Sequence, residues 1–298
     1  MKMKYSLLVL PILFFQYCRS QGIEKIATNK DDNTLLWEIS GNGMAKPSYL
    51  FGTFHLMCKD DIRFSENLKK ALSNSKEVYF EMDLDDPANT LGAMFYMNMK
   101  DGVTLKDLYT PEEYSRVEHY FKDSLQTGMA MMERIKPTML QSFLYPKMIA
   151  CKSISGVEME VMALAAKDKK EIKGFETIAF QTSVFDSIPY KDQAKELLNI
   201  IDSVDSYTQY FDTMLNVYKE QQLSELQKMF SDPQFNVGEA NQEILLDKRN
   251  MNWVQQLKNI LPKNSVFIAV GAGHLVGEKG LIELLKKEGY NMRPLLNK

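Results

Sequence analysis

Short apolar runs near both ends of the chain are the clearest feature of its hydrophobic pattern. The runs are LLWEIS (35–40), SYLFGTF (48–54), EVYFEMDL (77–84), SVFIAVG (265–271) and NMRPLL (291–296). Runs of this length, rich in branched and aromatic residues and bounded by turn-forming residues, are typical of β-strands. The GNGMAKP segment between the first two runs predicts a hairpin with a loop longer than the tightest kind.

Apolar residues that recur at steps of three and four predict helices between these strands. The segment 110–125 opens with Thr110, Pro111 and two acids, which is the usual order at a helix start. Ser65 takes the same capping position in the segment 64–75. Helices are predicted at 64–75, 110–125, 158–169, 243–261 and 278–289.

The order of these elements predicts a mixed α/β (α+β) fold, with a central mixed β-sheet flanked by helices. The regions at about 87–150 and 190–260 are helical in pattern, and we interpret them as a helical insertion in the middle of the chain. Neither a linker nor an internal repeat divides the sequence. We therefore expect residues 21–298 to form a single domain.

The first residues of the chain have the pattern of a secretory signal. MKMK supplies positive charge, SLLVLPILFF supplies an apolar stretch too short to span a bilayer, and small residues follow. This order predicts a signal peptide over about 1–20 and a secreted or periplasmic protein. Lipid attachment at Cys18 is the alternative, although the bulky Tyr17 before it fits a lipoprotein signal poorly. No later stretch is apolar and long enough to predict a transmembrane span.

The overall composition is that of an ordinary globular protein. Of the 298 residues 45% are hydrophobic and 25% are charged, and the net charge is −3. Because nucleic-acid binding depends on neutralising phosphates with Lys and Arg, this charge argues against it. Beyond the predicted signal two cysteines remain, Cys58 and Cys151, and the sequence alone leaves open whether they pair.

Two turns at opposite ends of the sequence share one pattern. LFGTFHL (50–56) and AVGAGHL (269–275) each run from an apolar strand through Gly-x-x-His to Leu, which brings in Gly52 with His55 and Gly271 with His274. Ligands in an open α/β sheet gather beyond the carboxyl ends of strands, and a glycine there lets other chain segments approach closely. Two neutral imidazoles with a carboxylate can hold a divalent metal, so the two turns predict a metal site.

Acidic residues at strand ends are the candidates for the third ligand. Glu81 ends an apolar strand, where a carboxylate is costly unless it is paired or bound to metal. Asp83 lies two residues on and would face the same way, as a further ligand or an orienting residue. Glu176, in KGFET, fits a ligand, a general base or an acid at a helix start. Glu158 and Glu160, which follow Gly156, are weaker candidates.

A helical pair, Arg249 and Asn250, supplies a candidate electrophile. An arginine can stabilise an oxyanion without changing its protonation, although a solvated helix face is the simpler interpretation of this pair. The third histidine, His119, lies on a predicted helix away from any cluster, and we interpret it as structural. The sequence contains no Gly-x-Ser-x-Gly nucleophile elbow, phosphate loop or His-Glu-x-x-His zinc helix.

The segments LLWEISGNGMAKPSYLFGTFHL, VYFEMD, KGFETIAFQ, LLDKRNMNW and VFIAVGAGHLVGEKGLIELLKKEGYNM together resemble the TraB/GumN family, whose animal relatives are the Tiki metalloproteases. The resemblance runs in order over about 35–296, and the Gly-x-x-His turns are its most specific part. It implies a metal-dependent hydrolase-like fold. The motif histidines of the family map onto His55 and His274, its acids onto Glu81 and Glu176, and its arginine onto Arg249. The Tiki relatives cleave peptides with manganese or cobalt.

The residues and the resemblance together predict a metal-dependent, peptidase-like hydrolase. His55, Glu81 and His274 would hold one divalent ion, Mn, Co or Zn, which would lower the pKa of a bound water. Glu176, or Glu81 if it is no ligand, would transfer the proton, and Arg249 would stabilise the oxyanion. We expect a peptide or small-molecule substrate. Two alternatives stay open: a binding protein without turnover on the same fold, and a metal-dependent esterase-type hydrolase.

Overall fold

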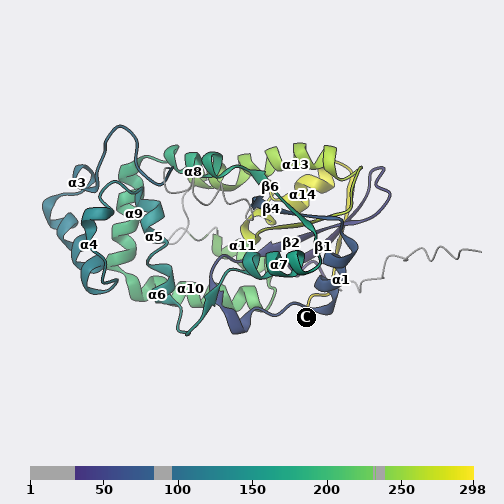
Figure 1. Cartoon of the computed structure of the whole chain (residues 1–298), viewed down its shortest axis with the longest axis horizontal. Helices are drawn as coiled ribbons and strands as arrows, with labels where there is room; N and C mark the ends of the chain where they lie inside the picture. Colours follow the sequence, from purple (N-terminus) through teal and green to yellow (C-terminus); the bar gives the residue numbers. More distant parts are fainter. Residues whose placement is uncertain (1–30, 84–95, 231, 233–238) are drawn as a thin grey trace, which may run out of the picture.

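The computed structural model of the chain describes residues 31–83, 96–230, 232 and 239–298 (Figure 1). The predicted signal peptide at 1–20, with Cys18, lies outside the described residues, as does the start of the predicted helical insertion. No helix in the described ranges is both apolar enough and long enough to cross a membrane.

A mixed β-sheet forms the centre of the described structure. Its six strands lie in the order β6-β4-β7-β2-β1-β8. The four strands β6, β4, β7 and β2 are parallel, and β1 joins β2 and β8 in antiparallel pairing. The bounds are β1 Leu36–Gly41, β2 Ser48–Thr53, β4 Glu77–Met82, β6 Glu171–Glu176, β7 Val266–Gly271 and β8 Tyr290–Pro294. The predicted mixed α/β fold and the β1–β2 hairpin are therefore confirmed.

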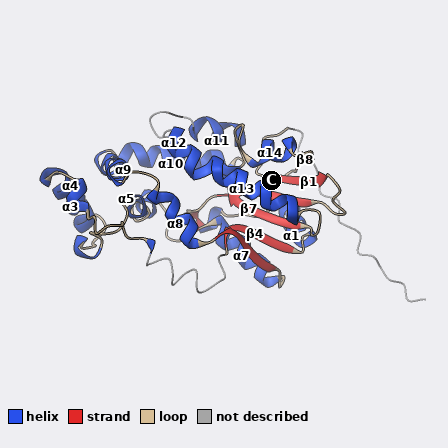
Figure 2. Cartoon of the chain, turned by 90° about the horizontal axis from the view of Figure 1, so that it is seen from above, coloured by secondary structure: helices blue, strands red, loops and turns tan. Residues whose placement is uncertain are grey.

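The central strands are continuously apolar because the sheet is covered on both faces. Every residue of β2 is buried, and so is Val266–Val270 of β7. Figures 1 and 2 show α13 and α14 on one side of the sheet and α7 on the other. The helices near the sheet are α1 Glu66–Asn74, α7 Val157–Lys167, α13 Lys248–Ile260 and α14 Leu281–Lys287.

Helices from the middle of the chain gather away from the sheet. Figure 1 shows α3, α4, α5 and α9 at the far end, with α8 and α10 running between them and the sheet. The bounds of the helices in this region are α3 Leu105–Leu108, α4 Pro111–Asp123, α5 Pro137–Gln141, α6 Tyr145–Met148, α8 Ile178–Asp186, α9 Tyr190–Asp202 and α10 Val204–Lys219. The next helix, α11 Leu223–Phe230, lies nearer the sheet, against the turn that follows β7. Before α13 come α12 Glu239–Gln242 and a π-helical turn, η3 Glu243–Asp247. Short 3-10 turns lie at η1 Lys59–Asp61, η2 Met129–Met131 and η4 Ala272–His274.

Helix capping follows the sequence signals closely. Ser65 accepts a hydrogen bond from the Leu68 amide at the start of α1, and Thr110 forms a capping box with Glu113 at the start of α4. The predicted helix over 243–261 is one continuous run whose first turn is π-helical. The predicted helix at 278–289 is shorter in the structure, beginning at Leu281.

A small second sheet joins two distant segments of the chain. β3 (Met57–Cys58) pairs with β5 (Ile154–Ser155), and beside it a disulfide connects Cys58 and Cys151, whose Cα atoms are 5.9 Å apart. The bond closes a loop with a sequence separation of 93. The sequence alone left open whether these cysteines pair, and the fold brings them close enough to form a disulfide.

Candidate functional site

Four parallel strands end at one edge of the sheet and bring the predicted site residues there. Their register pairs Thr53 with Gly271 and Met82 with Glu176. Because the carboxyl ends of parallel strands meet at the same edge, residues in the last positions of β4 and β6 and just beyond β2 and β7 become neighbours. These are His55, Glu81, Glu176 and His274, which come from distant parts of the sequence.

Gly271, the last residue of β7, lies where three of the predicted metal ligands meet. Its amide donates to Glu81 Oε1 at 2.9 Å. A Cβ added to Gly271 would lie 3.3 Å from Glu81 Oε1, 3.7 Å from His274 Cδ2 and 3.9 Å from His55 Nε2. A side chain at this position would therefore fill the space that the two imidazoles and the carboxylate surround.

The buried guanidinium of Arg249, on α13, joins two of the acids. It donates to Glu176 through Nε, at 3.0 and 3.1 Å, and through Nη2 at 2.8 Å, and a second Nη2 bond reaches Glu81 Oε2 at 2.7 Å. Its Nη1 atom donates to the Leu245 carbonyl at 2.9 Å and contacts His274 Nε2 at 3.2 Å. All five N–H groups of Arg249 are thus directed at protein acceptors. An oxyanion would have to replace one of these partners.

Both oxygens of the Glu176 carboxylate accept hydrogen bonds within this cluster. Its side chain is 1% exposed, and Trp253 Nε1 donates to Oε1 at 2.8 Å while Arg249 donates to both oxygens. The Arg249 guanidinium also lies 4.8 Å from the Trp253 ring centre, close enough for a cation–π contact. These contacts favour a structural role for Glu176, in which it holds Arg249 in place. They argue against a role as the base that takes a proton from water.

His274 is buried with a fixed ring orientation. The Asn250 side chain donates from Nδ2 to the carbonyls of His274 and Lys279, so its Oδ1 faces His274 Nδ1 as an acceptor at 2.6 Å. Burial lowers the pKa of His274 to about 3; the charge of Glu81 opposes the shift, and those of Arg249 and His55 add to it. A neutral ring with its proton on Nδ1 presents the Nε2 lone pair toward Arg249.

Glu81 is held as a carboxylate ion. Burial alone would raise its pKa, but His274, Arg249, His55 and the Gly271 amide lower the pKa to about 2. Gln181, on α8, adds a hydrogen bond from Nε2 to Oε2 at 3.0 Å. The charge of Glu81 is therefore stabilised by several hydrogen-bond donors, and its Oε1 lies 3.6 Å from His274 Nε2.

His55 differs from His274 in its exposure. Its side chain is 72% exposed, and Nδ1 lies 2.7 Å from Glu158 Oε1. Desolvation acts to lower the pKa of His55, but the hydrogen bond and charge of Glu158, with the charge of Glu81, raise it to about 9. Thr53 Oγ1 donates to the same Glu158 oxygen at 2.5 Å.

Comparison with known proteins assigns the chain to a family. The model of the TraB/PrgY/gumN family matches residues 35–294, which include all these site residues. The chain belongs to the TraB/PrgY/gumN family. It is similar to Metalloprotease TIKI1 of Danio rerio, 23% identical over 323 residues that cover 91% of this chain and 65% of the relative. It is also similar to a Metalloprotease TIKI homolog of Amphimedon queenslandica, 23% identical, with 92% of this chain and 64% of the relative covered.

A human relative is similar to the chain to the same degree. Metalloprotease TIKI1 of Homo sapiens is 23% identical over 318 residues, which cover 87% of this chain and 61% of the relative. The chain spans less than two thirds of the length of these relatives. No solved structure matches it. The names of the relatives support a hydrolase or protease function, and with it a metal cofactor, at the level of the family.

Not every residue predicted for the site of this TraB/PrgY/gumN family member joins the cluster. Asp83 follows β4 and lines an open surface cavity of about 520 Å³ with Lys173 and Glu176. His119 is exposed on α4, where it lies 3.1 Å from Asp123. Gly52 is part of the strand packing, since a Cβ there would lie 3.1 Å from Leu275 and 3.2 Å from Ala272 Cα.

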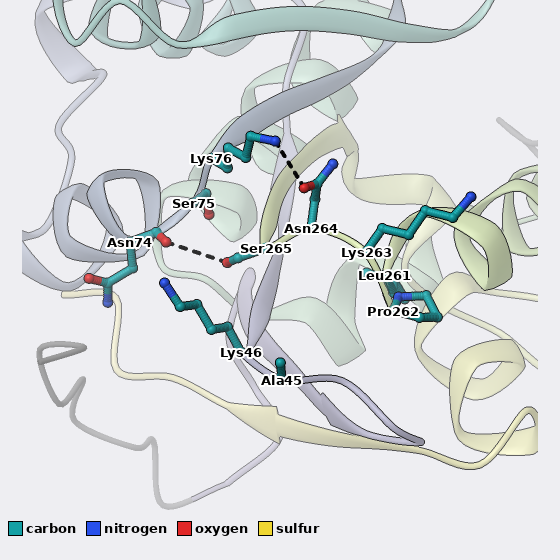
Figure 3. Close-up of a pocket in the computed structure, with 10 residues that line it drawn as sticks. All are labelled: Ala45, Lys46, Asn74, Ser75, Lys76, Leu261, Pro262, Lys263, Asn264 and Ser265. Atoms are coloured by element: carbon teal, nitrogen blue, oxygen red, sulfur yellow. Dashed lines mark hydrogen bonds between the residues drawn. The ribbon is translucent and has the colours of Figure 1, made fainter. Parts of the chain in front are cut away.

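Another cavity, of about 310 Å³, lies at the opposite edge of the sheet, where the parallel strands begin (Figure 3). Its lining includes Lys46, Lys76, Asn264 and Ser265, and it contains neither a histidine nor a carboxylate. Lys76 Nζ donates to Asn264 Oδ1 at 3.1 Å across this cavity. Its lining residues therefore have no part in the cluster around Gly271.

The sequence analysis does not identify three residues that hydrogen-bond to the acids of the site: Thr53, Gln181 and Trp253. Trp253 follows Arg249 by one helical turn, so it lies on the same face of α13, and this spacing was the available signal. Thr53 and Gln181 gave no comparable signal, because their partners Glu158 and Glu81 lie 105 and 100 residues away in the sequence.

The donor types around Gly271 fit a divalent metal. Two imidazoles and a carboxylate form a common ligand set for zinc, cobalt or manganese. Over the described ranges, however, no three His, Cys, Asp or Glu side chains are grouped closely enough to hold a metal ion as they stand. The Nη1 and Nη2 atoms of Arg249 lie against His274 Nε2 and Glu81 Oε2. Binding at His274 Nε2 would have to replace the Arg249 contact.

Proposed function

We propose that this protein is a metal-dependent hydrolase that cleaves peptides, and that it acts in the secreted or periplasmic space. The observation that carries the proposal is the meeting of Glu81, His274 and His55 around the bare backbone of Gly271. These three residues would hold the ion, and a divalent metal there would supply Lewis acidity to polarise a carbonyl and make water more acidic. Family membership and the names of the relatives support the same activity.

The residues of the chain have distinct tasks in this proposal. Glu81 is kept anionic by the Gly271 amide, Gln181 and Arg249, and an anionic oxygen is what a divalent cation binds. Glu176 fixes the Arg249 guanidinium beside Glu81 and His274. Arg249 would stabilise an oxyanion by redirecting one of its N–H groups, for example the one directed at His274 Nε2.

The disulfide supports the proposed compartment. Disulfide bonds form and persist in oxidising environments such as the periplasm and the extracellular space. Cys58 and Cys151 are joined in the folded protein. Together with the signal-like pattern of the first twenty residues, this bond favours export of the protein.

A metal assay with three matched variants tests the proposal. Purified protein would be titrated with Mn, Co and Zn, alongside His55→Ala, His274→Ala and the control His119→Ala. The control removes the exposed histidine of α4, which lies outside the cluster. We expect metal binding to be lost in the first two variants and kept in the third. Equal binding in all three would contradict the proposal.

A digest of a peptide library separates hydrolysis from binding alone. With Mn, Co or Zn added, we expect cleavage by the wild type and its loss in Glu81→Gln, with the fold confirmed by circular dichroism. Saturable peptide binding without cleavage would contradict an enzyme and favour the binding-protein alternative. Cleavage of ester substrates alone would favour the esterase alternative.

A further inference from the structure

Glu158 is a buried carboxylate directly behind His55. It lies in the first turn of α7, and its side chain is 12% exposed whereas that of His55 is 72% exposed. Its Oε1 atom lies 2.7 Å from His55 Nδ1 and accepts from Thr53 Oγ1 at 2.5 Å. The exposed imidazole of His55 therefore contacts, through Nδ1, a buried carboxylate that also accepts a hydrogen bond from Thr53.

The backbone around this pair is tied together at several points. The Val157 amide donates to the Phe54 carbonyl at 3.0 Å, and Met57 pairs with Ser155 in the small sheet. The disulfide between Cys58 and Cys151 closes the same region. The segment that carries His55 and the segment that carries Glu158 therefore form one cross-linked unit.

Gly156 allows the two segments to approach closely. A Cβ at this position would lie 2.7 Å from the His55 carbonyl oxygen and 3.2 Å from Glu158 Oε2. The first distance is shorter than real Cβ atoms tolerate, so any larger residue would push the two segments apart. The glycine thus preserves the contact between Glu158 and His55.

The two histidines are anchored in the same manner. Asn250 Oδ1 lies 2.6 Å from Nδ1 of His274, and Glu158 Oε1 lies 2.7 Å from Nδ1 of His55. The other nitrogen of His55, Nε2, borders the space beside Gly271, whereas Nε2 of His274 contacts Arg249 Nη1 at 3.2 Å. An acceptor on Nδ1 sets both the tautomer and the plane of an imidazole, and a carboxylate also raises its strength as a ligand.

We propose that Glu158 is the positioning residue of His55, holding the ring through Nδ1 so that Nε2 faces Glu81 and His274. The inference rests on the proposed metal-dependent function. Glu158 does not touch the reacting atoms in this arrangement. It acts through His55, and Thr53 in turn orients Glu158.

The test uses Glu158→Ala and Glu158→Gln, with Glu160→Gln as the matched control. Glu160 lies on the same helix turn but contacts Ser155 and Lys59 instead of His55. The first measurement is the NMR order parameter of the His55 ring in the metal-free protein. We expect it to fall in Glu158→Ala, to be largely restored in Glu158→Gln, whose amide oxygen can still accept from Nδ1, and to stay unchanged in Glu160→Gln.

The second measurement is the affinity for Mn or Zn by calorimetry. Losing an outer-shell partner typically weakens metal binding about 10–100-fold, and we expect a loss of this size in Glu158→Ala only. Unchanged ring order and unchanged affinity in Glu158→Ala would overturn the inference. If the wild type binds neither metal, the proposed function fails, and the ring order by itself then supports or overturns the positioning role.

Discussion

Arg249 and Glu176 form a buried ion pair that fixes the geometry of the candidate site. The Arg249 guanidinium donates to both oxygens of the Glu176 carboxylate, and its Nη2 atom also reaches Glu81. Burying an ion pair costs desolvation free energy, which can exceed the attraction between the two charges. The main contribution of this pair is therefore the position that it gives to the neighbouring side chains. Here it holds positive charge next to the carboxylate and the imidazole that we propose as metal ligands.

Removing Arg249 should be strongly destabilising. In Arg249→Met, the buried carboxylates of Glu81 and Glu176 lose their cation, and breaking a buried pair in this way costs about 3–5 kcal/mol. The control is Lys248→Met at the preceding residue, whose pair with Glu243 is exposed and should be worth less than about 1 kcal/mol. Urea denaturation followed by circular dichroism measures both. Equal losses of unfolding free energy in the two variants would contradict a structural role for Arg249.

Asn250 should matter for both stability and metal binding. In Asn250→Ala, His274 Nδ1 and the carbonyls of His274 and Lys279 lose a partner, and each buried polar group left unsatisfied costs about 1–3 kcal/mol. We also expect weaker metal binding, because the His274 ring is no longer held. Asn252→Ala, on the exposed face of the same helix, is the control and should change neither quantity. Calorimetric metal titration and thermal denaturation measure the two effects.

A methyl group at Gly271 should damage the site more than the fold. The added Cβ in Gly271→Ala would lie 3.3 Å from Glu81 Oε1 and within 4 Å of both histidines. Because ligand geometry tolerates displacements of only about 0.5 Å, we expect metal affinity to fall about tenfold or more. The control Gly128→Ala adds a methyl group where nothing lies within 4 Å. Wild-type metal affinity in Gly271→Ala would argue against ligation at this position.

The disulfide should contribute measurably to stability. Replacing Cys58 and Cys151 together by serine removes a cross-link over a sequence separation of 93, and such a loss typically costs about 2–4 kcal/mol. Guanidinium denaturation with and without a reductant measures the effect. The reductant should lower the stability of the wild type and leave the double variant unchanged. A reductant effect on the double variant would show that another group is responsible.

Acid stability should depend on Asp186. Burial acts to raise the pKa of this carboxyl, but hydrogen bonds from Lys136, Tyr190 and Lys100 and the charge of Lys136 lower it below 3.8. A carboxyl whose pKa is depressed in the folded state stabilises the protein above its unfolded pKa, and this contribution is lost as the pH falls. Between about pH 5 and pH 2, the unfolding free energy should therefore fall more steeply in the wild type than in Asp186→Asn. Parallel curves for the two proteins would contradict the assignment.

Several features of the fold follow from short-range patterns in the sequence. Continuous apolar runs identify β4 and β7 as covered strands, and Ser65 and Thr110 mark helix starts because a side-chain oxygen can cap the amides within three residues. The Gly-x-x-His turns, being local too, identified His55 and His274 as residues beyond strand ends. Parallel pairing of the strands then places both histidines at one edge of the sheet.

The tertiary structure alone decided which distant side chains meet in the candidate site. The sequence predicts Glu176 as a ligand, a general base or an acid at a helix start, but its pairing with Arg249 spans a sequence separation of 73, and no local pattern encodes that contact. The same holds for Glu158 behind His55 and for Cys58 with Cys151. Local periodicity and capping depend on residues within a few positions of one another, so the sequence determined the elements and the strand-end location of the histidines. Which acid faces a histidine and which holds an arginine depends on how distant strands and helices pack, and only the folded chain fixes that.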